Sequence, residues 1–288
     1  MPPRVHGRYL GGCVMTDQRS RLAAWLSGDG IEIGALHHPL PVRPGTTVTY
    51  VDWKDEVGIR EHYPELKRWS LAPVSVVATA EDLGPFADES LDFVIANHLL
   101  EHLELPIRAL MEFQRVLKPG GVLYMALPDG RLTFDKRRQP TTIEHLFEEQ
   151  RKGAEANRRD HYLEWAMKVD GKQGTEAEGH AADLVARRYS IHFHVWTPDT
   201  FLDFLVAARR EFGLDFQLLG YAVAEREIDL EFIVVLARAQ EEVRLPPSRT
   251  LDGRGLIRLR RQLASTALGP PVRAVTRFLA PHISRVRR

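Results

Sequence analysis

The stretch LDFVIAN at residues 91–97, followed by RVLKPGG at residues 115–121, decides the fold class. The first stretch is almost continuously apolar, which is typical of a strand that is buried on both faces of a parallel sheet. Residues 99–117 have the apolar spacing of a helix, in which we expect the glycines of RVLKPGG to form the C-terminal cap. Another apolar run follows at 121–127. This order of strand, helix and strand predicts an α/β protein.

Further strand patterns lie on both sides of this unit. They are short, rich in β-branched residues and bounded by glycine, proline or charged residues. A capped helix beginning at 197 and ending near 213 precedes the last two strands, whose short connection predicts antiparallel pairing. The expected strands are 31–34, 46–52, 74–78, 91–96, 121–127, 216–223 and 228–237. We therefore predict a Rossmann-like, doubly wound, mainly parallel seven-stranded sheet.

The segment from 131 to 190 does not follow this alternation. It is polar and helix-rich, with aromatic and histidine residues spaced along it. We interpret it as a helical insertion after the fifth strand, within a domain that spans residues 1–240. We interpret its aromatic residues as residues that pack the helices together, in preference to a sugar-binding surface. Insertions of this kind commonly carry substrate recognition on an α/β scaffold.

Composition excludes several classes of protein. The 288 residues contain 39 basic and 39 acidic side chains, so a globally basic nucleic-acid-binding protein is not expected. A single cysteine cannot form an internal disulfide or a cysteine zinc site. No apolar stretch is long enough to span a membrane, and residues 1–12 lack the apolar region of a signal peptide. We expect a cytoplasmic protein, with Met15 as a possible alternative start.

Charge is unevenly distributed along the chain. Residues 241–288 contain 11 arginines and 3 acidic residues, whereas the preceding 240 residues carry a net charge of −8. Apolar stripes beside the arginines indicate basic amphipathic helices. We interpret 241–288 as a separate tail, for which peripheral membrane contact, docking on protein and a solvated tail all remain open.

The ordered set LDFVI at 91–95, LEHL at 100–103, RVLKPGG at 115–121 and Pro128 resembles the class I S-adenosylmethionine-dependent methyltransferases of the type 11 kind. The resemblance is good over about 31–130 and weaker to about 238. It implies that S-adenosyl-L-methionine is the cofactor. The segment 191–197 (IHFHVWT) also resembles a group that we associate with bacterial polysaccharide or glycolipid biosynthesis.

The resemblance also implies where the cofactor binds. The residues follow the carboxyl ends of successive strands, where ligands bind in open parallel sheets. The turn at Glu32, Gly34 and Ala35 is expected to hold the methionine part, and a carboxylate at Asp52 to accept the ribose hydroxyls. The remaining expected cofactor residues are Thr79, Ala80 and Glu81, beside the adenine, and Asn97, beside the transferable methyl.

Two positions depart from the family pattern. Gly34 is the only glycine in a loop that usually has two or three, and Thr79 stands where the family usually has aspartate. These departures motivate an alternative function, a binding or scaffold protein that retains the methyltransferase fold with weak or absent activity. The missing G-x-G-x-x-G motif argues against a nicotinamide-dependent oxidoreductase.

Transfer to a hydroxyl requires a group that removes its proton, and histidine is suited to this near neutral pH. The candidate catalytic bases are His98, His192 and His194. The favoured acceptor is a hydroxyl of a small molecule or of a glycan or glycolipid. Asp129 either faces this acceptor or caps the turn that follows it.

Some of these histidines also lie in patterns that are found in metal sites. Residues 98–102 spell H-x-x-E-H, a zinc protease pattern, but the flanking strand and the downstream LKPGG favour a strand-to-helix junction. His192 and His194 alternate, so they share one face of an extended segment with Trp196. They are interpreted as packed histidines or as a wall of the acceptor pocket. No third ligand is indicated, so no metal site is expected.

Overall fold

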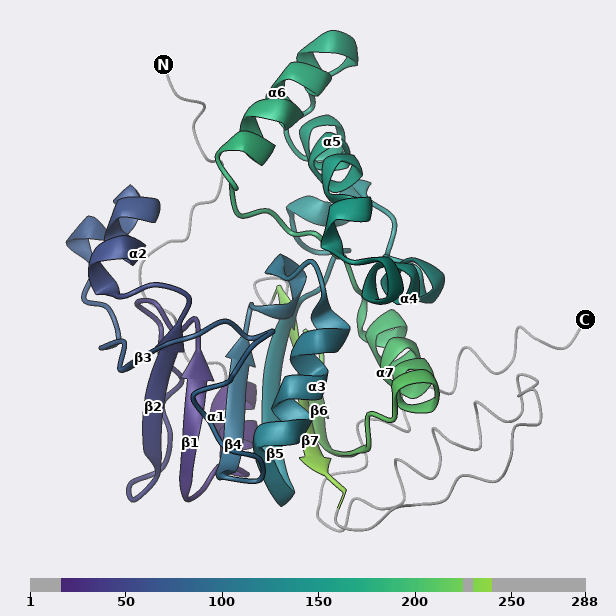
Figure 1. Cartoon of the computed structure of the whole chain (residues 1–288). Coiled ribbons are helices and arrows are strands. Elements are labelled where there is room, and N and C mark those ends of the chain that lie inside the picture. Colours follow the sequence, from purple (N-terminus) through teal and green to yellow (C-terminus); the bar gives the residue numbers. More distant parts are fainter. Residues whose placement is uncertain (1–16, 225–229, 240–288) are drawn as a thin grey trace, which may run out of the picture.

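A computed structural model describes residues 17–224 and 230–239 (Figure 1). Its described part contains a seven-stranded sheet in the order β3-β2-β1-β4-β5-β7-β6. The first five strands are parallel, and β7 is antiparallel to both β5 and β6. The strands are β1 Asp29–Ile33, β2 Thr47–Asp52, β3 Val76–Val77, β4 Leu91–Asn97, β5 Leu117–Pro128, β6 Phe216–Ala222 and β7 Glu231–Arg238. The predicted fold class and the antiparallel pair are confirmed.

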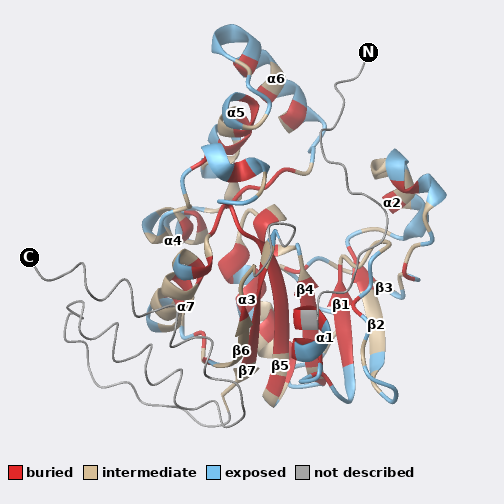
Figure 2. Cartoon of the chain, turned by 180° about the vertical axis from the view of Figure 1, so that it is seen from behind, coloured by how far each residue is buried: buried red, intermediate tan, exposed pale blue. Residues whose placement is uncertain are grey.

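Helices cover both faces of the sheet, as its apolar composition requires. One face packs against α3 (Pro106–Val116) and α7 (Pro198–Phe212), and the other against α1 (Asp17–Ala23). Each face of the sheet has its own apolar core, and alternate β4 residues belong to one or the other. Val94 and Ala96 face α3 and α7, whereas Phe93 and Ile95 face the side of α1. Figure 2 shows β4 and β5 buried along most of their length.

The junction between α3 and β5 differs from the expectation in one detail. The helix ends at Val116 with Leu117 as its C-cap in an extended conformation, so the glycines do not cap it. Instead, Gly120 has φ 80° inside the first part of β5. The register between β4 and β5 shifts between Leu91 and Phe93. The glycines therefore accommodate an irregularity of the strand.

The segment after β5 forms a helical insertion that stands beyond the end of the sheet (Figure 1). It contains α4 (Ile143–Lys152), α5 (Arg158–Lys168) and α6 (Gly174–Ala186). Residues of α5 and α6 bury a small apolar core of their own, which also includes Ile191 and Phe193. The short elements of the described chain are α2 Glu56–His62, η1 Pro64–Arg68, η2 Leu100–His102, η3 Phe134–Arg137 and η4 Ala154–Ala156.

Residues 191–196, which we name the strap, return the chain from the insertion to the sheet. All six are buried. The Phe193 N–H donates to the Glu101 carbonyl (2.7 Å), and Trp196 forms an isolated parallel bridge with Asp129 just beyond β5. The strap therefore lies against the carboxyl edge of the sheet.

No helix in the described ranges is both long and apolar enough to cross a bilayer. The predicted tail, residues 241–288, lies outside the described residues, as do residues 1–16 with Met15.

Candidate active site

The loop after β1 carries the first expected cofactor residues. Glu32 is buried at the end of β1, and both of its carboxylate oxygens lie 3.0 Å from the Leu40 N–H, which donates to them. Gly34 has φ 70°, and Ala35 follows it. Leu36 also takes a left-handed conformation, with φ 48°, a conformation that usually selects glycine. The loop thus makes a second left-handed turn without a second glycine.

Two buried carboxylates of this edge are costly to ionise. Burial raises the pKa of Glu32 to about 7, against the lowering effects of the Leu40 N–H and the Arg19 charge. Burial likewise raises the pKa of Asp52 to about 6, although its Oδ1 accepts a hydrogen bond from the Trp53 N–H (2.8 Å). Both groups lie at the carboxyl ends of neighbouring strands. A ligand with hydroxyl or ammonium donors would favour their ionised forms.

The residues after β3 form a tight turn. Thr79 is exposed and pairs with Asp82 in an isolated bridge, and Ala80 is buried. The Glu81 carboxylate accepts a hydrogen bond from the Leu105 N–H (3.0 Å), at the start of α3. Glu81 therefore ties this turn to α3 through its side chain.

Asn97 and His98 follow β4. Asn97 Oδ1 accepts from the Ala126 N–H (3.1 Å), while its Nδ2 is buried without a hydrogen-bond partner among the described residues. His98 has φ 47° and lies between two carboxylates, 2.7 Å from Glu231 and 3.4 Å from Glu101. Burial lowers its pKa, but these carboxylates outweigh that effect and raise the pKa to about 9. At neutral pH His98 is protonated and is poorly suited to accept a proton.

His192 has the geometry of an oriented base. Its Nδ1 lies 2.6 Å from Asp135 Oδ2, and the carboxylate is buried. Burial raises the pKa of Asp135, but His192 and Arg138 outweigh this and leave it below its ordinary value. An ionised carboxylate on Nδ1 fixes the imidazole with Nδ1 protonated, so Nε2 is the proton acceptor. No periodic pattern pointed to Asp135, because it lies in a short 3-10 turn at the irregular start of the insertion.

Arg138 joins this pair to the strap. Its guanidinium donates to Asp135 Oδ1 (2.9 Å) and to the carbonyls of His192 (2.7 Å) and Phe193 (3.1 Å). Its side chain is 1% exposed, so these contacts are shielded from water. The backbone and the side chain of His192 are therefore both fixed.

The surroundings of His192 combine polar and aromatic side chains. His102 packs edge-on against it, with ring centroids 4.7 Å apart, and burial lowers the pKa of His102 to about 4. Phe134 lies 4.7 Å from the His192 ring and is 41% exposed, and Trp165 lies 6.0 Å away. A base beside an exposed aromatic face is a suitable wall for an organic acceptor.

Several expectations about the histidines are corrected. His192 and His194 do not share one surface: His192 faces Asp135, whereas His194 lies with Glu149, His145 and His161. Three other potential metal ligands therefore lie beside His194. The expectation of no metal site rested on the lack of a third candidate ligand, and the structure supplies such candidates because the insertion brings together residues that are distant in sequence.

The zinc protease pattern at 98–102 is not formed. His98 is left-handed, and only residues 100–102 form a short 3-10 turn, so no helix presents both histidines on one face. Asp129 caps its own turn, because its Oδ1 accepts from the N–H (3.0 Å) and the Nε (2.9 Å) of Arg131.

Part of the chain that forms this edge of the sheet is similar to known proteins. A family model described as a methyltransferase domain matches residues 27–125, which run from the start of β1 into β5. We name residues 27–125 the methyltransferase domain, after the family model that they match. The match implies S-adenosylmethionine as the cofactor.

The chain is similar over short segments to curated proteins. It is 45% identical over 63 residues to a human protein named thiol S-methyltransferase TMT1B, covering 20% of this chain and 26% of that protein. It is 43% identical over 69 residues to an uncharacterized protein of Methanocaldococcus jannaschii, covering 22% and 33%. The chain thus spans only about a quarter to a third of the length of these relatives.

A solved structure of a SAM-dependent methyltransferase from Methanosarcina mazei matches 75% of this chain and 94% of its own, with 19% identity and a TM-score of 0.40. One of a methyltransferase from Bacillus halodurans matches 76% and 95%, with 15% identity and a TM-score of 0.41.

The residues of the methyltransferase domain fit this cofactor. Gly34 leaves open space beside its backbone, since an added Cβ would meet only Leu99 Cδ1, at 3.7 Å. The buried Asn97 Nδ2 and His37 Nδ1 are donors or acceptors without partners in the described part of the chain. Asp52 supplies a buried carboxylate at the end of β2, the strand on the other side of β1. A polar ligand at this edge would satisfy these groups.

Proposed function

We propose that this protein transfers the methyl group of S-adenosylmethionine to a hydroxyl of a small-molecule, glycan or glycolipid acceptor, with His192 as the general base. One observation carries the proposal: the buried Asp135–His192 pair is tied to the turn after β4, next to the cofactor edge. The strap makes this link, since the Phe193 N–H donates to the Glu101 carbonyl.

Each group has a defined task in this reaction. The cofactor supplies a methyl group that is already electrophilic on its sulfonium sulfur. Glu32, Gly34 and Asn97 would hold its amino-acid part, and Asp52 its ribose hydroxyls. His192 Nε2 takes the acceptor proton as the oxygen attacks, and Asp135 stabilises the resulting imidazolium. With the acceptor bound, the insertion and the strap would shield the reacting groups from water.

The aromatic side chains beside His192 support an organic acceptor. Phe134 exposes two-fifths of its surface and lies next to both His192 and Trp165. A flat apolar face beside a polar base suits the alternating apolar and hydroxyl faces of a sugar ring. A thiol acceptor, which the name of the human relative describes for that protein, would use the same base.

Calorimetric titration with S-adenosylhomocysteine tests the cofactor site. We expect binding by the native protein and a loss of about 10-fold or more in affinity for Asp52→Ala, which removes an acceptor of ribose hydrogen bonds. Asp88→Ala is the matched control, since this carboxylate is 73% exposed and precedes β4 at the opposite edge. Failure of the folded native protein to bind would favour the scaffold alternative.

Transfer from radiolabelled cofactor to panels of glycan, small-alcohol and thiol acceptors tests the base. We expect His192→Gln and Asp135→Asn to lower kcat by about 10²- to 10⁴-fold while S-adenosylhomocysteine affinity is unchanged. His180→Gln, on α6, is the control. Transfer to thiols alone would refute the hydroxyl acceptor, and full activity of His192→Gln would refute the base.

A further inference from the structure

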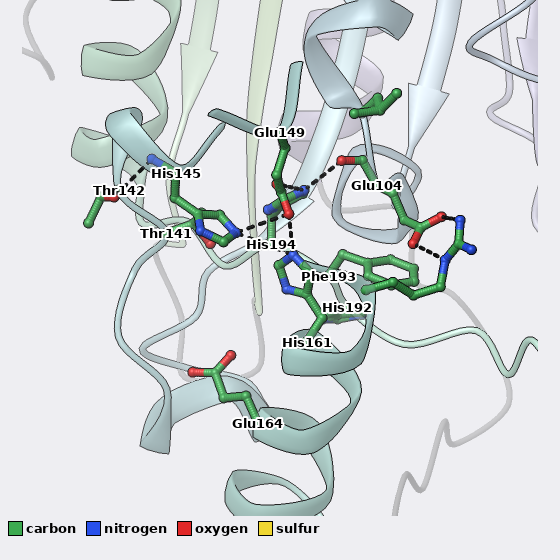
Figure 3. Close-up of polar contacts among 12 residues, drawn as sticks. Glu104, Thr141, Thr142, His145, Glu149, His161, Glu164, His192, Phe193 and His194 are labelled. Carbon is green, nitrogen blue, oxygen red and sulfur yellow. Dashed lines mark hydrogen bonds and ion pairs between the residues drawn. The ribbon is translucent and has the colours of Figure 1, made fainter. Parts of the chain in front are cut away.

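A second polar cluster lies inside the insertion, apart from the proposed base. His145 and Glu149 are four residues apart on α4 and therefore share one face of that helix. His161 reaches them from α5 and His194 from the strap. Figure 3 shows Glu149 between the three imidazole rings. Three separate segments thus direct metal-binding side chains to one point.

Three of four distances within this cluster are close to those between the ligands of a small metal ion, and the fourth is a short hydrogen bond between His161 and Glu149. The Nε2 atoms of His145 and His161 are 3.3 Å apart. Glu149 Oε1 lies 3.1 Å from His145 Nε2 and 2.6 Å from His161 Nε2, and Oε2 lies 3.5 Å from His194 Nε2. Zinc bonds of about 2.0–2.1 Å in a tetrahedron place ligand atoms about 3.3 Å apart.

Hydrogen bonding among these groups leaves part of the cluster unsatisfied. Two imidazole nitrogens face the single oxygen Glu149 Oε1, whereas Glu149 Oε2 and His194 Nδ1 are buried without hydrogen-bond partners in the described residues. Glu149, His161 and His194 are all buried. Buried ionised groups are usually paired or bound to a metal, because desolvation without compensation is costly.

We propose that His145, Glu149, His161 and His194 bind one zinc ion. Three neutral imidazoles and one carboxylate form a ligand set that suits zinc among the divalent ions, and magnesium would be disfavoured by the nitrogen ligands. Four protein ligands complete a tetrahedron, which is the arrangement of a structural zinc site.

The zinc ion would fasten the insertion to the edge of the sheet. It links α4, α5 and the strap, whose neighbouring residue Phe193 donates to the Glu101 carbonyl. His192 lies two residues from His194 and belongs to the same strap. The metal would therefore stabilise the position of the proposed base without contacting the acceptor.

Metal analysis of the full-length protein, stripped with a chelator and reloaded with zinc, tests this site. We expect one zinc per chain, a higher Tm with zinc than without it, and no effect of magnesium. Glu149→Gln and His161→Ala are expected to weaken zinc binding by about 10²-fold or more, since even the loss of outer-shell partners costs 10- to 100-fold. His180→Ala is the matched control, because His180 also pairs with a carboxylate, that of Asp170 (2.9 Å).

Replacement of the least buried ligand guards against variants that do not fold. His145→Cys retains a metal-binding group, so the cobalt-loaded variant is expected to show a thiolate-to-cobalt absorption band that the cobalt-loaded native protein lacks. This band would identify residue 145 as a ligand whatever the activity of the enzyme.

Two results would overturn the proposal. One is full zinc content in folded Glu149→Gln together with no thiolate band in His145→Cys. The other is loss of zinc in His102→Ala but not in His161→Ala, which would move the metal to the neighbouring group of Glu101, His102 and His192. S-adenosylhomocysteine binding, measured in the same samples, reports separately on the proposed function.

Discussion

Asp52 and Glu32 are carboxyls whose pKa values lie close to neutral pH, at about 6 and about 7. If the ionised forms accept hydrogen bonds from the cofactor, affinity for S-adenosylhomocysteine rises as the pH increases from 5 to 8. Each group contributes at most about tenfold per pH unit below its pKa. Calorimetry from pH 5 to 8 measures this increase in affinity. In Asp52→Asn the affinity should change less with pH near pH 6. Constant affinity from pH 5 to 8 would contradict this role.

Glu32 also affects the stability of the cofactor-free protein. Burial raises its folded-state pKa above the ordinary value, so its stabilising contribution is complete below about pH 4.5 and is lost as the pH rises through about 7. Glu32→Gln avoids this loss. We expect denaturant unfolding at pH 8 to show Glu32→Gln more stable by about 1–3 kcal/mol, and unable to bind cofactor normally. Equal free energies of unfolding for the native protein and Glu32→Gln at pH 8 would show that ionised Glu32 does not destabilise the fold.

Some features of single residues could be predicted from the sequence, and others could not. Asp52 was predicted because it ends a recognisable strand, and the structure buries it there. Leu36 was not expected to adopt a left-handed conformation, since nothing in its side chain favours one. Asp135 becomes a partner of His192 only through a contact across 57 positions of the chain.

At the scale of elements, the strap depends on a close approach to Gly130. A Cβ at this position would lie 2.4 Å from Val195 Cγ1 and 3.3 Å from the Trp196 carbonyl oxygen. Gly130→Ala is therefore expected to displace the strap and to lower the free energy of unfolding by about 1–3 kcal/mol.

The Val195→Ala variant tests whether the contact with Val195 causes the loss of stability in Gly130→Ala. It removes the methyl group that collides, so the double variant Gly130→Ala, Val195→Ala should be more stable than the sum of the single effects. Chemical denaturation of the four proteins measures the coupling. Simple additivity would show that the contact with Val195 is not the source of the strain.

The strands of the sheet and helix α7 were predictable because their apolar spacing is repeated and bounded. Thr197 caps α7 in a capping box and Gly213 ends it in the left-handed conformation, as their positions indicated. The strap was quoted as a motif, yet its buried path between insertion and sheet follows from contacts with Glu101 and Asp129, which no local pattern encodes.

At the scale of the whole molecule, the proposed cofactor site and the proposed zinc site lie in different parts of the chain, the methyltransferase domain and the insertion. Hydrogen exchange should therefore respond to each ligand in a different region. We expect S-adenosylhomocysteine to slow exchange in the loop 34–40 and around Asn97, and zinc to slow it in α4, α5 and the strap. Protection of α4 and α5 by S-adenosylhomocysteine alone, with no response to zinc, would contradict two independent sites.

The order of strands has a consequence for synthesis on the ribosome. Strand β7 lies between β5 and β6 and pairs with seven residues of β5, from Val122 to Pro128. Until residue 238 has emerged, β5 has an apolar, unpaired edge, and β6 has no strand of the described sheet to pair with. A nascent chain therefore carries an edge that is prone to pair with other chains, and its sheet closes only when the last described strand is inserted into the interior.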